Sequence, residues 1–130
     1  MRSDLGRTLL LRNTMARPGQ IPADAAIEMA TTFAQTPTFD AHLAATRRER
    51  FRDGAAIDVP VTVAWGDKER LIPAKARRRD QLPEHTRFVT LRGCGHTPMW
   101  DDPQLVARTI LDGGRPTASP AKRATTPSTS

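Results

Sequence analysis

The chain has 130 residues, enough for about one small domain, and its 20 Lys and Arg against 14 Asp and Glu give a formal net charge of +6. Its single cysteine, Cys94, excludes an internal disulfide framework. No apolar run approaches the ~20 residues of a membrane-spanning helix, and the apolar stretch 9–11 is shorter than the ~7–15 residues of a signal-peptide core. We therefore expect a cytoplasmic protein that does not bind membranes.

The positive charge is concentrated at the C-terminal end. Residues 113–130 contain three basic residues and no acid, which is half of the net charge, and they are rich in Pro, Ser and Thr. Such a segment cannot bury enough apolar surface to fold, so we expect a disordered tail. The Arg-rich clusters at 47–52 and 77–79 are more typical of solvated helix faces than of a phosphate-binding surface. Nucleic-acid binding through the tail is the weakest alternative, and we expect no nucleic-acid partner.

Two helices are predicted in the N-terminal half. Residues 22–35 place apolar side chains at helical spacing, and Pro37 ends that pattern. A second helix is expected from 39 to 51, with Thr38 as its N-cap.

The pattern then changes to alternating strands and helices. The β-branched run 57–65 predicts a buried strand, 73–81 a short helix and 86–91 a second strand. Asp102 is the expected N-cap of a last helix, which Gly113 stops. Strand, helix, strand and helix in this order imply an α/β fold with two parallel strands. Because parallel strands need cover on both faces, we expect these two to be edge strands of a larger doubly wound sheet.

Two loops carry the residues that are capable of chemistry. Trp65–Pro73 follows the first strand, and Gly93–Pro103 follows the second. The carboxyl ends of parallel strands lie at one edge of a sheet, where ligands bind in such folds. A carboxylate on the first loop can therefore meet His96 on the second, hold its tautomer and stabilise the imidazolium formed during general-base catalysis.

The motifs in these loops resemble a known family. Trp-Gly-x-x-acid-x-x-x-Pro at 65–73, followed by Leu-x-Gly-x-Gly-His-x-Pro-x-x-Asp-x-Pro at 91–103, is similar to the C-terminal part of α/β-hydrolase fold enzymes. The resemblance implies that His96 is the catalytic histidine and that Glu69 occupies the acid position. Asp67, two residues earlier, is the alternative acid. The implied activity is hydrolysis of an ester, epoxide or related bond in a small-molecule substrate, without a cofactor.

The resemblance also suggests an organisation of the chain. Residues 57–112 would be the C-terminal part of the hydrolase core, with two parallel edge strands and flanking helices. Residues 1–56 match more loosely the end of a helical cap, and 113–130 are the tail.

The nucleophile that such an enzyme needs is missing from these residues. Serines occur only at positions 3, 119, 128 and 130, and none lies in a Gly-x-Ser-x-Gly elbow. We therefore expect the chain to be a truncated, C-terminal portion that supplies two members of a catalytic triad and is inactive alone. The alternative is a non-catalytic remnant that associates with itself or another protein through its exposed sheet edge and an uncovered apolar face (Val61, Val63, Phe88, Val89 and Leu91).

The remaining candidate residues are expected to have ordinary roles. Cys94 is interpreted as a small turn residue, and His42 and His85 as surface residues. Met99 and Trp100 are predicted to be apolar wall or core, with a lining role in a substrate pocket as the alternative. No metal site is expected, because no cluster of His, Cys and Asp has ligand spacing.

Overall fold

The computed structural model describes residues 4–48 and 51–114, so the predicted disordered tail lies outside the described residues except for its first two glycines. Within these ranges the helices are α1 (Asp4–Leu11), α2 (Ala23–Gln35), α3 (Phe39–Arg48), α4 (Pro98–Asp101) and α5 (Pro103–Gly113), and the strands are β1 (Thr62–Gly66) and β2 (Arg87–Leu91). None of the described helices is long and apolar enough to cross a membrane.

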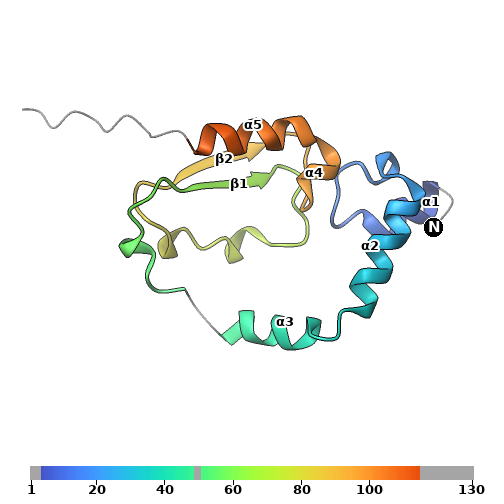
Figure 1. Ribbon diagram of the computed structural model, residues 1–130, viewed down its shortest axis with the longest axis horizontal. Helices are drawn as coiled ribbons and strands as arrows, with labels where there is room; N and C mark the ends of the chain where they lie inside the picture. The colour runs from blue at the N-terminus through green and yellow to red at the C-terminus, as the bar shows by residue number, and fades with distance from the viewer. Residues whose placement is uncertain (1–3, 49–50, 115–130) are drawn as a thin grey trace, which may run out of the picture.

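The two strands confirm the predicted parallel pair. Their register runs from Thr62 opposite Arg87 to Gly66 opposite Leu91, and in the described part of the chain they make up the whole sheet. β1 starts later than predicted, because Pro60 cannot donate a ladder hydrogen bond. Helix α5 packs along one face of the pair, and the crossover from β1 to β2 runs along the other (Figure 1).

The crossover corrects one prediction. In place of a helix over 73–81 it has two 3₁₀ turns, Ala74–Ala76 and Arg79–Gln81. This segment has no apolar stripe to bury. Instead, its arginines cover rings of the sheet: the Arg77 guanidinium lies 4.7 Å from the Trp65 ring centroid, and that of Arg79 lies 4.0 Å from the Phe88 centroid.

The last helix begins as predicted. The Asp102 carboxylate accepts a 2.8 Å hydrogen bond from the Leu105 backbone N–H, and Pro103 occupies the first turn. Both features satisfy the needs of a helix N-terminus, where backbone N–H groups have no partner within the helix.

The N-terminal segment forms a small core of its own. Leu11, Met15, Ile21 and Ala26 are buried together, between α1 and the start of α2. Helix α1 was not predicted. Helix α2 matches its prediction, whereas α3 is shorter than 39–51, because Phe51 lies outside any helix.

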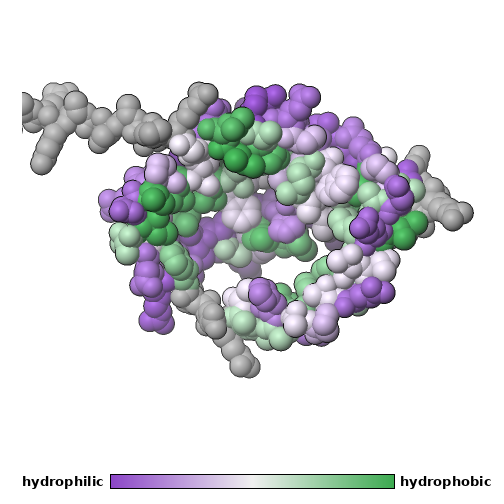
Figure 2. Space-filling model, in the orientation of Figure 1, coloured by the Kyte–Doolittle hydropathy of each residue, from purple (hydrophilic) through white to green (hydrophobic). Residues whose placement is uncertain are grey.

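Helices α2 and α3 form an arm that leads away from this core. Every described side chain from residue 31 to 46 is exposed, and the arm is braced by an edge-to-face contact of Phe33 and Phe39, with ring centroids 4.5 Å apart. In the space-filling view the molecule is hollowed between this arm and the crossover from β1 to β2 (Figure 2). The arm therefore presents apolar side chains that nothing in the described residues covers.

The prediction that Val61, Val63, Phe88, Val89 and Leu91 form one uncovered apolar face is wrong. Because side chains alternate along a strand, Val63 and Phe88, which are in register, lie on one face of the sheet, and Val89 and Leu91 lie on the other. Leu91 is buried, whereas the other three are half-buried.

Candidate active site

The loops that follow β1 and β2 are joined by backbone hydrogen bonds. The Asp67 N–H donates to Leu91 O at 3.1 Å, and the Lys68 N–H donates to Cys94 O at 2.9 Å. The two loops run so close together that a Cβ added at Gly66 would lie 2.2 Å from Cys94 O. Only glycine fits at this crossing, and the crossing brings Glu69 and His96 to the same place.

Glu69 and His96 form a hydrogen-bonded pair. His96 Nδ1 lies 2.8 Å from Glu69 Oε2, with 3% of the Glu69 side chain and 31% of the His96 side chain exposed. The other carboxylate oxygen, Oε1, accepts the backbone N–H groups of Leu71 at 2.7 Å and Ile72 at 3.0 Å. The carboxylate is thus fixed on one side by its own loop and is directed at the imidazole on the other.

The environment of Glu69 favours its charged form. Burial alone would raise the pKa of this carboxyl. The hydrogen bonds from the Ile72 N–H, from His96 and from the Leu71 N–H outweigh burial, so the pKa lies below its ordinary value of 4.5. A carboxylate that stays ionised beside Nδ1 favours the tautomer with a proton on Nδ1 and a free lone pair on Nε2.

The alternative acid, Asp67, has a different partner. Its Oδ1 accepts the Gly93 N–H at 2.7 Å, at the residue where the backbone enters the left-handed region with φ of 73°. Asp67 therefore braces the turn that leads to His96, and the structure brings Glu69, not Asp67, to the imidazole.

Cys94 lies in the same turn but is buried. Its side chain is fully inaccessible, and its Sγ lies 3.7 Å from Arg92 O. Burial, and then the negative charges of Asp101 and Asp102, raise the pKa of the thiol above its ordinary value. A thiol in this state is a poor nucleophile, which agrees with its interpretation as a turn residue.

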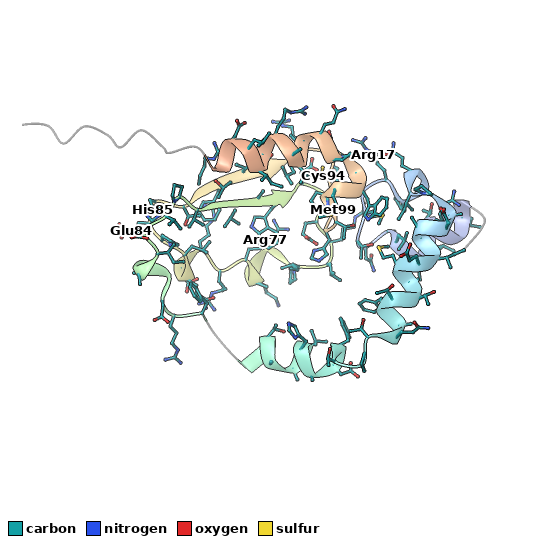
Figure 3. The ribbon with its side chains drawn as sticks, viewed as in Figure 1. Arg17, Arg77, Glu84, His85, Cys94 and Met99 are labelled. Carbon is teal, nitrogen blue, oxygen red and sulfur yellow. The ribbon has the colours of Figure 1, made fainter. Side chains whose placement is uncertain are left out.

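The other histidines lie elsewhere. His42 is exposed on α3, and His85 Nε2 lies 2.9 Å from Val59 O. Figure 3 shows His85 and Glu84 at one end of the strands and Cys94 at the other. In the described part of the chain, no three His, Cys, Asp or Glu residues are grouped so that they could hold a metal ion.

Met99 and Trp100 are not core residues, since they are 53% and 40% exposed. The other part of the prediction, an apolar wall, fits Trp100. Trp100 lines an open, mainly apolar groove with α2 residues that include Met29 and Phe33. Trp100 follows His96 by four residues in the sequence, so the histidine loop contributes one wall of this groove.

Asp101 is the residue whose role in the site was missed. Its side chain is buried, with 5% exposed, and its carboxylate accepts three backbone N–H groups, from Ala16, Arg17 and Gly95. Asp101 is the aspartate of the Asp-x-Pro pattern that follows His96. Two of its hydrogen-bond partners, however, are 84 and 85 residues away. No local pattern could have revealed them.

The fold is shared with two larger proteins of known structure. A membrane phospholipase A, described as a novel bacterial virulence factor, superposes with a TM-score of 0.62 at 20% identity, over 86% of this chain and 38% of its own. Cfl2 from Burkholderia cenocepacia gives a TM-score of 0.57 at 22% identity, over 86% of this chain and 40% of its own.

The present chain thus spans about two fifths of each of these proteins, and at this identity the likeness is one of fold. No family model matches the sequence, and the search of curated proteins finds no match either.

Proposed function

We propose that this chain supplies the general base and its orienting acid to a hydrolase with the α/β-hydrolase fold. The observation that carries the proposal is the 2.8 Å contact between His96 Nδ1 and a buried Glu69 carboxylate that two further N–H groups hold in place. The loop motifs and the likeness to a phospholipase A support the same assignment.

The proposed chemistry follows from the free nitrogen of His96. Nε2 takes the proton of an attacking hydroxyl, or of a water that resolves a covalent intermediate, and later returns that proton to the leaving group. Glu69 holds the Nδ1–H tautomer and stabilises the imidazolium while the charge is present. The nucleophile comes from residues outside these 130, since no elbow occurs in the sequence.

The likeness to a membrane phospholipase A makes a carboxylic ester with an apolar acyl group the first substrate to try. In this proposal the groove beside Trp100 would take the apolar part of that substrate.

The test compares the chain alone with the chain joined to the coding sequence that precedes Met1 in its gene. Alone, it should hydrolyse no p-nitrophenyl ester above background. Joined to an upstream segment with a Gly-x-Ser-x-Gly or Gly-x-Asp-x-Gly elbow, it should turn over, and His96→Ala should lower kcat by about a million-fold. His85→Ala, at the far end of the strands, is the matched control and should leave the rate unchanged.

Two results would count against the proposal. Turnover by the isolated chain that His96→Ala abolishes would mean that a nucleophile within these residues was overlooked. Turnover by the longer protein that survives His96→Ala would remove the histidine from the mechanism.

A second candidate function is association through the sheet. It is favoured by a parallel sheet that has only two strands in the described residues, since each strand then has one outer edge whose backbone groups can pair with another chain. In this reading the chain is a non-catalytic module that adds its strands to a partner.

A further inference from the structure

A buried carboxylate lies between the histidine loop and the N-terminal segment. Asp101 Oδ2 accepts the Gly95 N–H at 2.7 Å and the Ala16 N–H at 3.0 Å, and Oδ1 accepts the Arg17 N–H at 2.8 Å. The Asp101 side chain extends from helix α4, and the segment after α1 supplies the N–H groups of Ala16 and Arg17. Three donors from two distant parts of the chain therefore converge on one carboxylate.

The residue on each side of His96 is held by this arrangement. Gly95 is bonded to Asp101, and Thr97 donates both its backbone N–H and its Oγ1 hydroxyl to Thr14 O, at 2.8 Å and 3.0 Å. A Cβ added at Gly95 would lie 2.9 Å from Ala16 N, so the two segments are in direct contact. The backbone that carries His96 is thus fixed by the N-terminal segment, while Glu69 fixes its ring.

Hydrogen bonds to a buried carboxylate are strong, and losing them is costly. A buried charge persists only where hydrogen bonds replace its lost hydration. Bonds from N–H groups to a carboxylate are about twice as strong as neutral ones. Removing the carboxylate would leave the N–H groups of Gly95, Ala16 and Arg17 without this acceptor inside the protein, which is the costly case.

We propose that Asp101 is a positioning residue for His96, and that it makes the segment Thr14–Arg17 part of the active site. Asp101 does not touch the reacting atoms. It acts by holding the loop at the position from which Nδ1 reaches Glu69. The inference rests on the proposed function in one respect, namely that His96 is the catalytic base.

The neighbouring residue provides a matched control. Asp102 carries the same charge and also accepts one backbone N–H, that of Leu105, but this bond caps α5 and does not touch the histidine loop. Asp101→Asn and Asp102→Asn therefore remove the same charge one residue apart. Both are compared with the wild-type chain by NMR, using amide hydrogen exchange and the ¹⁵N signals of the His96 ring.

The expected result separates the two variants. In Asp101→Asn, the amides of Gly95, Ala16 and Arg17 should exchange about tenfold faster or more. The ¹⁵N signals of the His96 ring should change from those of a single Nδ1–H tautomer to those of a mixture of tautomers. Asp102→Asn should leave these signals as they are and should accelerate exchange at Leu105. Unchanged His96 and Gly95 signals in Asp101→Asn, or equal changes in both variants, would overturn the inference.

A measurement on the wild type covers the case in which Asp101→Asn does not fold. If one carboxylate holds both segments, Gly95, Ala16 and Arg17 should share one opening equilibrium and one dependence on denaturant. Independent opening of Gly95 and Ala16 would contradict the proposal. Exchange tests this role whether or not the chain hydrolyses anything, so loss of hydrolytic function with these couplings intact would overturn only the proposed function.

Discussion

At the scale of single residues, the site depends on carboxylates that accept backbone N–H groups. Glu69 keeps its charge because two backbone N–H groups and one imidazole nitrogen replace the water it has lost. Asp67, which is exposed, accepts the Gly93 N–H, and Asp101, which is buried, accepts the N–H groups of Gly95, Ala16 and Arg17. The three carboxylates differ in what they hold: the ring, the turn and the loop of one histidine.

The lowered pKa of Glu69 predicts a dependence of stability on pH. A carboxyl whose pKa is lower when folded than when unfolded stabilises the fold at pH values above its ordinary pKa of 4.5. That contribution is lost as the pH falls from about 5 through the folded value. Denaturant midpoints measured between pH 7 and pH 3 should therefore fall more steeply for the wild type than for Glu69→Gln.

Glu84→Gln is the control for this measurement, since Glu84 is exposed and lies at the other end of the strands from Cys94 (Figure 3). Its pH profile should follow that of the wild type. Parallel profiles for the wild type and Glu69→Gln would show that Glu69 is not stabilised as a carboxylate in the fold.

At the scale of elements, the site is built where two loops cross at a glycine. Gly66 ends β1, and a side chain there would collide with the backbone at Cys94. Gly66→Ala should therefore push the two loops apart and destabilise the protein by about 1–3 kcal/mol or more. Urea unfolding measures the change.

Gly19→Ala is the matched control, because nothing lies within 4 Å of the added Cβ and the residue is exposed. It should change stability by no more than about 0.5 kcal/mol. Equal effects of the two substitutions would mean that the loops are not in contact at Gly66.

The elements that local signals determine were predictable, and the others were not. The two strands follow from β-branched runs, and α5 follows from Asp102 and Pro103, whose effects act within one turn. The helix over 73–81 failed because its arginines lie on rings of the sheet, a tertiary contact that overrides local preference.

The candidate site divides in the same way. Topology and motif spacing led to Glu69 and His96, because the ends of adjacent parallel strands must lie together. The part played by Asp101 depends on backbone groups at Ala16 and Arg17, which no pattern near residue 101 specifies.

At the scale of the whole molecule, the sheet offers backbone hydrogen-bonding groups to a partner. Two parallel strands have outer edges with no further strand in the described residues, and the α2–α3 arm leaves apolar side chains exposed. Both features favour association. We therefore predict that the isolated chain elutes from a sizing column as a species larger than a monomer, increasingly so with concentration.

A charge on the strand tests whether β1 is responsible. Ala64 is exposed on β1, and Ala107 is exposed on α5. Ala64→Lys should shift the chain toward the monomer, because lysine on an edge strand opposes pairing, whereas Ala107→Lys should not. A compact wild-type monomer with a sharp thermal transition would argue against association through the sheet.

The separation along the chain of the groups that Asp101 joins has a consequence for folding. Glu69 and His96 are 27 residues apart, whereas Asp101 bonds to groups 84 and 85 residues away. The entropy lost on closing a loop grows with its length, and contacts between distant residues slow folding. Glu69 and His96 can therefore meet early, within one strand–crossover–strand unit, while the bonds that fix the position of the histidine loop form only when the two ends of the fold come together.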